Sequence, residues 1–179
     1  MNQVLENILS RRSVRDYKPE QIPKESLEQI LLAGRYAASG WNKQLWKFVA
    51  IQDRTVLDSV DRALKQSILN IDSENTTEVI SKYLNFLKPK AESSDDLFLG
   101  APTLIIIAAQ KDNYTSRDDC ALAAGNMMLM ATELNIGSCW LGTLPVFTEA
   151  PEIRNIFEAL GIPENYDIYS SLALGYPTK

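Results

Sequence analysis

The segment TLIIIAA, residues 103–109, is the feature that most constrains how this chain can fold. It is a continuous apolar run of strand length with no alternating polar residue. A strand of this kind is expected at the centre of a sheet whose two faces are both covered, because neither side tolerates water. The rest of the chain must therefore supply packing layers for both faces of a sheet.

Helical and strand patterns alternate around this central strand. Apolar residues recur at helical spacing in four further segments, and three others are rich in aromatic and β-branched side chains. The expected helices cover residues 3–10, 24–38, 54–69 and 151–160, and the expected strands cover residues 45–51, 138–144 and 168–177. This order predicts one α+β domain over residues 1–179, with helices packed on a sheet.

Two segments stand out from this alternation. CALAAGNMMLMATEL, residues 120–134, is apolar nearly all round, which predicts a buried central helix with its methionines in the core. Ser116 and Asp119 precede it as an S-x-x-D capping signature. Residues 70–96 are polar and acidic around a possible helix over 78–87, which indicates an insertion or flap over the core.

The absence of histidine is the most useful fact in the composition. It excludes Ser-His-Asp and Cys-His catalysis, histidine zinc sites and histidine general bases. The two cysteines, Cys120 and Cys139, have no metal-binding spacing and are expected to be reduced core thiols. No metal site is predicted, and any redox chemistry must come from a bound cofactor.

Charge is unevenly distributed along the chain. The formal net charge is -5, although residues 1–50 carry more lysine and arginine than acid. A globally acidic protein repels nucleic acid, so a small anion is the better partner for the arginines. The sequence has neither an apolar stretch long enough to cross a membrane nor a signal peptide, which predicts a cytoplasmic protein without a membrane partner.

RRSVRDY, residues 11–17, supplies the candidates for anion binding. The guanidinium groups of Arg11, Arg12 and Arg15, with the Ser13 hydroxyl, could cradle a phosphate or the edge of a polarised ring. The alternative is a solvated basic turn, since cations are favourable after a helix C-terminus.

Two further segments could approach a flat ligand. In AASGWNKQLW, residues 37–46, Asn42 and Gln44 could pair with a ring edge, or the segment could be an ordinary loop. In GSCWLGT, residues 137–143, exposed amides near Gly142 could face an anion or a ring, or the glycine could mark a strand bulge. Trp41 and Trp46 are expected to serve packing.

Taken in order, these segments resemble the nitroreductase family of FMN-dependent oxidoreductases. The resemblance lies in RRSVRDY, in ESLEQILLAGRYAASGWNKQLWKFVAI, in APTLIIIAA, in DCALAAGNMMLMATELNIGSCWLG and in LALGYP, and so spans nearly the whole chain. It implies an α+β fold with a central mixed or antiparallel sheet, and a homodimer with FMN at its interface. It also implies ping-pong transfer from NADH or NADPH through the flavin to a small acceptor such as a nitroaromatic or a quinone.

The resemblance also implies roles for individual residues. Arg11 and Ser13 match residues at the FMN phosphate, Arg12 is less clearly assigned, and Arg15 matches the cation beside the pyrimidine edge of the ring. Ser39 and Gly40 match positions that reach the flavin from the partner subunit, with Asn42 and Gln44 close by. Leu141 and Gly142 match the stretch whose amides approach the reactive edge. No side chain is expected to be catalytic, since the flavin carries the chemistry.

The sequence departs from the family pattern in two places. Ala38 and Leu45 stand where the family often has proline. Relatives usually continue beyond GYP with a Lys/Arg pair that grips the phosphate, whereas this sequence ends at Lys179. Lys179, Arg12 or a lysine elsewhere in the chain could replace those charges. The departure leaves open a flavin reservoir or sensor with little turnover, or a dimer that has lost its cofactor.

Overall fold

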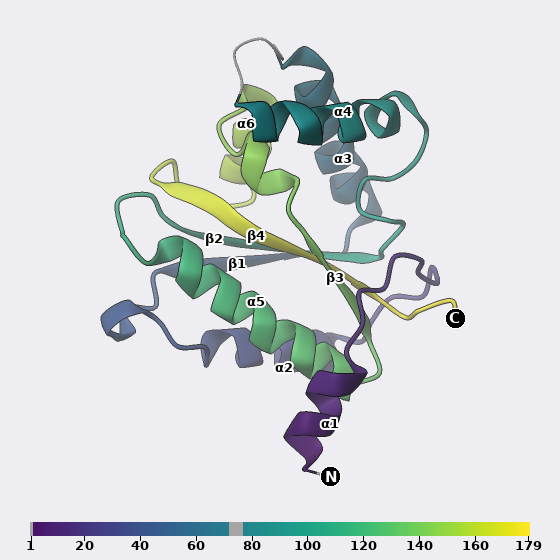
Figure 1. Cartoon of the computed structure of the whole chain (residues 1–179), viewed down its shortest axis with the longest axis vertical. Coiled ribbons are helices and arrows are strands. Elements are labelled where there is room, and N and C mark those ends of the chain that lie inside the picture. Colours follow the sequence, from purple (N-terminus) through teal and green to yellow (C-terminus); the bar gives the residue numbers. More distant parts are fainter. Residues whose placement is uncertain (1, 72–76) are drawn as a thin grey trace.

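The computed structural model describes residues 2–71 and 77–179, which form a four-stranded sheet between two layers of helices (Figure 1). The strands are β1 (Trp46–Ile51), β2 (Thr103–Gln110), β3 (Gly137–Leu141) and β4 (Tyr166–Gly175). Their order is β1-β2-β4-β3, and each neighbouring pair is antiparallel. The predicted α+β class is confirmed, and this sheet is antiparallel rather than mixed.

Strand β2 lies inside the sheet and is buried on both faces. Its even-numbered residues, such as Ile106, pack in one apolar cluster, and its odd-numbered residues, such as Ile105, pack in another. Residues of a strand point alternately to opposite faces, so each cluster occupies one side of the sheet. The prediction of a central strand over 103–109 is confirmed.

Two helical layers cover the sheet (Figure 1). Helices α2 (Lys24–Arg35) and α5 (Ser116–Glu133) lie on one face. Helices α3 (Arg54–Asn70), α4 (Glu78–Glu92) and α6 (Pro151–Ala159) lie on the other. Within the described ranges, none of the helices is long and apolar enough to cross a bilayer.

Helix α1 (Gln3–Ser10) stands apart from these layers and buries none of its residues. It leans on the C-terminal part of α5, where the Asn7 amide donates to the Leu129 carbonyl at 3.1 Å. Its apolar side chains remain exposed in the single chain, which is unusual for an amphipathic helix.

Several boundaries differ from the expected ones. Helix α2 ends at Arg35 rather than at residue 38. Strand β3 ends at Leu141, and Leu144–Phe147 form a 3-10 turn instead of continuing the strand. The helix expected over 78–87 is present as the longer α4, and residues 72–76 of the expected insertion lie outside the described residues.

Helix α5 was expected to be buried all round, but only one side of it is covered. Ala123, Met127 and Ala131 are fully enclosed, whereas the Leu122 side chain is 51% exposed. Met128 and Met130 are partly buried against the same core, and both cysteines are buried free thiols, as expected. The uncovered side of α5 therefore presents apolar residues to whatever lies against it.

Candidate functional site

The segment after α1 runs along the outer edge of the sheet. The Val14 N–H donates to the Ser138 carbonyl of β3 at 3.0 Å, and Ser13 forms a parallel bridge with Ser138. The Lys18 N–H donates to the Tyr176 carbonyl at 2.8 Å. Backbone pairing on both sides therefore holds this arginine-rich segment, residues 11–18, in one place.

Arg11 and Arg15 lie near Cys139 of β3 with most of their donors unused. Burial raises the pKa of the Cys139 thiol, and the nearby Arg15 and Arg11 charges lower it. The guanidinium group of Arg11 forms no hydrogen bond or ion pair with any residue that the structure describes. Arg15 makes only a long bond, 3.5 Å, to the Ser13 carbonyl. Two guanidinium groups with free donors are a suitable partner for an anion.

Arg12 differs from its neighbours because it turns back onto α1. Its Nη1 donates to the carbonyl oxygens of Leu9 at 2.6 Å and Arg11 at 2.8 Å. These bonds satisfy carbonyl groups at the helix end, where a cation is favourable. For Arg12, the alternative of a helix-terminal cation describes its position in this chain.

The loop at residues 39–44 has an unusual backbone. Trp41, Asn42 and Gln44 adopt φ angles of 52°, 55° and 52°, in the left-handed region that few residues other than glycine occupy. The Gln44 N–H donates to Ser39 Oγ at 3.2 Å, and Gln44 Nε2 donates to Asn42 Oδ1 at 2.8 Å. Trp41 is exposed, so its predicted packing role is wrong within the single chain, whereas Trp46 stacks on Phe48.

A carboxylate of α5 fixes this loop. The Gly40 N–H donates to Asp119 Oδ1 at 3.0 Å, and Thr115 Oγ1 donates to Asp119 Oδ2 at 3.0 Å. Asp119 is only 4% exposed, and a Cβ at Gly40 would overlap the Thr115 side chain. These contacts form the Asp119 clamp, which consists of Gly40, Thr115 and Asp119.

The predicted S-x-x-D capping of α5 by Ser116 and Asp119 is wrong. The N-cap residue of α5 is Thr115, and no side chain caps the helix there. Ser116 instead donates its hydroxyl to the Gln110 carbonyl at 2.7 Å. The S-x-x-D pattern did predict a structural role for the Asp119 carboxylate. The carboxylate accepts from the Gly40 N–H, however, and this contact between distant segments cannot be predicted from the local sequence.

The loop 39–44 and the arginine-rich segment do not meet within one chain. The loop is bound near the start of α5 through Asp119, while α1, which leads into Arg11, is bound near its end through Leu129. At a rise of 1.5 Å per residue, these anchor points are separated by about 15 Å along the helix. Figure 1 shows α1 beside one end of α5 and the turn between α2 and β1 beside the other.

Leu141 is the last residue of β3, and Gly142 follows it. The Ser171 hydroxyl donates to the Leu141 carbonyl at 2.9 Å, which fixes the strand end. The N–H of Gly142 has no acceptor among the described residues. Thr143 is held from the other layer, because its hydroxyl bonds the Tyr83 hydroxyl of α4 at 2.7 Å. The end of β3 is therefore rigid while keeping a donor free.

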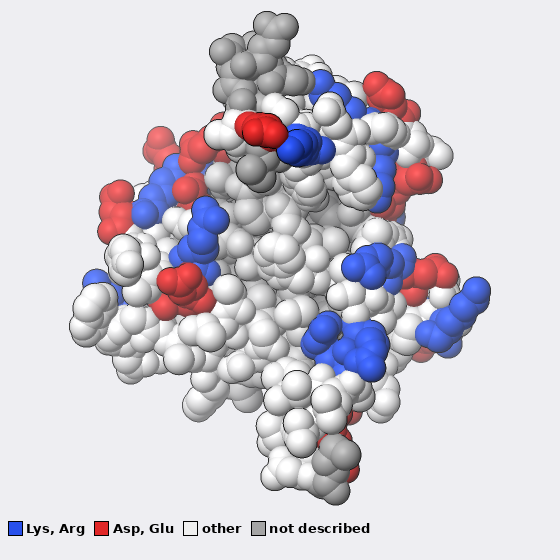
Figure 2. Space-filling view, viewed as in Figure 1, with Lys and Arg blue, Asp and Glu red and all other residues white. Residues whose placement is uncertain are grey.

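The last described residues lie next to the arginine-rich segment. Thr178 donates its N–H to the Asp16 carbonyl at 3.3 Å and its hydroxyl to Asp16 Oδ2 at 2.6 Å. Lys179 follows Thr178 directly and is exposed. Figure 2 shows basic side chains grouped on this side of a largely uncharged central surface.

Comparisons with known proteins agree on one family. The model of the nitroreductase family matches residues 8–176. A putative NADH dehydrogenase/NAD(P)H nitroreductase from Archaeoglobus fulgidus is 31% identical, over 99% of this chain and 87% of the relative. An iodotyrosine deiodinase from Thermotoga neapolitana is 27% identical, over 93% of this chain and 84% of that protein.

Solved structures show the same fold. A nitroreductase from Bacteroides fragilis, crystallised with bound FMN, superposes with a TM-score of 0.90 at 36% identity, covering 99% of this chain and 90% of the other. Together with the family match over most of the sequence, this similarity shows that the chain belongs to the nitroreductase family.

Proposed function

We propose that this protein is an FMN-dependent oxidoreductase that takes a hydride from NADH or NADPH and reduces a small acceptor such as a nitroaromatic or a quinone. The observation that carries the proposal is the pair of guanidinium groups, Arg11 and Arg15, whose donors are largely free beside β3. FMN offers both a phosphate and an electron-poor ring to such donors. The relatives that bind FMN support this choice of ligand.

The residues present fit the phosphate end of FMN. Arg11 and the Ser13 hydroxyl would bind the phosphate, and Lys179 would add a charge from the neighbouring C-terminal residues. Charge-assisted hydrogen bonds of this kind are about twice as strong as neutral ones.

The residues present also fit the ring. Bound FMN supplies the hydride-accepting chemistry, and the protein supplies position and charge. Arg15 would stabilise negative charge at the pyrimidine edge, and the free N–H of Gly142 next to Leu141 would approach the reactive edge. Because the end of β3 is held in place, this donor is pre-organised. A pre-organised donor stabilises developing charge most effectively, since it does not have to reorient during the reaction.

A second copy of the chain would complete the site. Through Gly40, the loop 39–44 is bound near the start of α5, whereas the helix that leads into the arginine-rich segment is bound near its end. We therefore assign the loop residues to the flavin of the partner subunit. They are Ser39, Gly40, Asn42 and Gln44. Exposed apolar residues on α1, α2 and α5 supply a surface for such a dimer. They are Val4, Leu5, Ile8, Leu9, Leu32 and Leu122.

Three measurements test the proposal. The purified protein should be yellow or become yellow on titration with FMN, sediment as a dimer, and lose its flavin absorbance on anaerobic addition of NADH or NADPH. A protein that stays colourless with excess FMN contradicts it. Flavin that binds but resists both donors would favour the reservoir or sensor instead.

A further inference from the structure

A cavity opens beyond the end of β3, next to Gly142. Its volume is about 440 Å³, which is large enough for a one-ring molecule. Strand β3, helix α4, the 3-10 turn at 144–147, the start of α5 and the start of β4 contribute to its wall. The lining residues used below are Ile80, Arg117, Trp140, Gly142, Val146 and Tyr169.

One part of the wall suits a flat aromatic ring. Trp140 is 51% exposed, and its indole N–H donates to Ser170 Oγ at 3.2 Å, which fixes the ring against β4. Ile80 and Val146 add aliphatic surface to the same cavity. An exposed, immobilised indole beside aliphatic side chains favours the binding of an aromatic molecule.

The other part of the wall carries two side-chain donor groups without a partner among the described residues. The Arg117 guanidinium and the Tyr169 hydroxyl form no hydrogen bond or ion pair there. Arg117 is close enough to lower the pKa of Tyr169, although burial and Asp167 raise that pKa overall, so the phenol stays protonated. An adjoining cavity of about 490 Å³ is lined by the same two residues.

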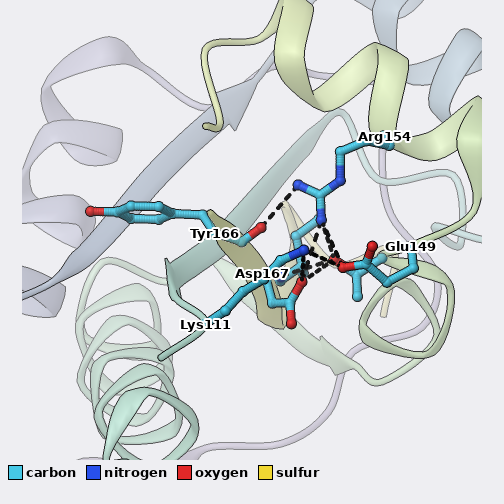
Figure 3. A network of polar contacts seen from close by, with 7 residues as sticks. Lys111, Glu149, Arg154, Tyr166 and Asp167 are labelled. Atoms are coloured by element: carbon cyan, nitrogen blue, oxygen red, sulfur yellow. Dashed lines mark hydrogen bonds and ion pairs between the residues drawn. The ribbon is translucent and has the colours of Figure 1, made fainter. Parts of the chain in front are cut away.

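Arg117 forms no ion pair with the acids that the structure describes around the cavity. Asp167 also lines the cavity, but it belongs to a network with Lys111, Glu149 and Arg154 (Figure 3). In that network Arg154 Nη2 lies 3.3 Å from both Glu149 Oε1 and Asp167 Oδ1, and Lys111 also contacts both carboxylates. Two cations balance two carboxylates in that network, and Arg117 lies outside it. Asp112 lines the adjoining cavity but forms no ion pair with Arg117.

We propose that this cavity binds an aromatic acceptor that carries a carboxylate. Arg117 and the Tyr169 hydroxyl bind the carboxylate, Trp140 packs against the ring, and the reducible group lies toward Gly142. The inference rests on the proposed function, since Gly142 is assigned there to the reactive edge of the flavin. It names the substrate class that the site would select.

A matched pair of ligands tests this selection. The FMN-loaded protein, without an electron donor, is titrated by calorimetry with 4-nitrobenzoate and with the neutral 4-nitrobenzamide of the same shape. The carboxylate should bind about tenfold more tightly, as expected for a charge-assisted contact. Arg117→Gln should remove this preference, and Tyr169→Phe should reduce it, while the affinity for the amide stays within about threefold.

Arg62→Gln, on the exposed surface of α3, is the control and should keep the wild-type preference. Equal affinity of the wild type for the two ligands, or a preference that survives Arg117→Gln, overturns the inference. This outcome differs from failure of the proposed function, which shows as absence of FMN binding or of flavin reduction. If FMN does not bind, the same titrations of the flavin-free wild type and Arg117→Gln still measure the preference.

Discussion

At the scale of single residues, the neighbours of a side chain decide its role more than its type does. Arg12 and Arg15 are three positions apart in the same segment, yet Arg12 bonds the end of α1 while Arg15 leaves most of its donors free beside Cys139. A sequence pattern cannot separate them, because both fit the same RRSxR motif. The structure separates them by their hydrogen bonds.

This difference leads to a prediction for Arg15→Ala. Loss of the charge at the ring should slow anaerobic flavin reduction by NADH or NADPH at least about tenfold, equivalent to about 1.4 kcal/mol of transition-state stabilisation. The FMN dissociation constant should rise less than this. Stopped-flow absorbance measures the rate, and Arg12→Ala should leave it nearly unchanged. An unaltered reduction rate in Arg15→Ala would show that the Arg15 charge does not act at the flavin ring.

The Asp119 clamp leads to a second prediction. Asp119→Ala leaves the Gly40 N–H and the Thr115 hydroxyl without their acceptor, which should lower the free energy of unfolding by about 1–3 kcal/mol in urea titrations. It should also weaken FMN binding in the dimer, because the loop carries Ser39 and Asn42. Asp118→Ala is the control, since it removes an exposed acid from the same first turn. Equal effects of both variants would argue against the clamp.

At the scale of elements, long periodic segments could be predicted, and their long-range contacts could not. The central strand followed from TLIIIAA, and helices α2, α3 and α6 followed from apolar spacing. The partner of Asp119 and the left-handed residues of the loop 39–44 depend on contacts between distant segments. The exposure of Leu122 depends on which other elements pack against α5. The sequence of one helix does not contain that information.

Helix α4 gives a test at this scale. The sequence indicated an insertion or flap, but Leu84 is completely buried in the cluster between α3 and the sheet. Leu84→Ala should therefore lower the free energy of unfolding by about 2–5 kcal/mol in urea titrations. Phe86→Ala, in the same helix but 60% exposed, should change it by less than about 1 kcal/mol. If Leu84→Ala lowers the free energy of unfolding as little as Phe86→Ala does, α4 does not contribute to the stability of the core.

At the scale of the whole molecule, the residues of the proposed site lie in two separate parts of the single chain. The arginine-rich segment and the end of β3 would form one half of the proposed site, and the loop 39–44, near the opposite part of α5, would form the other. Helix α1 directly precedes the arginine-rich segment, and its apolar residues are exposed in the single chain. A partner subunit that covers α1 would therefore also affect the position of the arginines. Dimer formation and FMN binding should therefore depend on each other.

Ile8→Asp tests this dependence. Ile8 is 49% exposed on α1, so an aspartate there costs little in a monomer but would place an unpaired charge in the proposed interface. Sedimentation velocity should show a shift from dimer to monomer, and FMN affinity should fall at least about tenfold because the partner residues are lost. Leu69→Asp, at a site of 44% exposure on α3, should change neither. A monomeric Ile8→Asp protein that keeps full FMN affinity would show that one chain holds the flavin alone, and the assignment of Ser39, Gly40, Asn42 and Gln44 to the partner's site would be wrong.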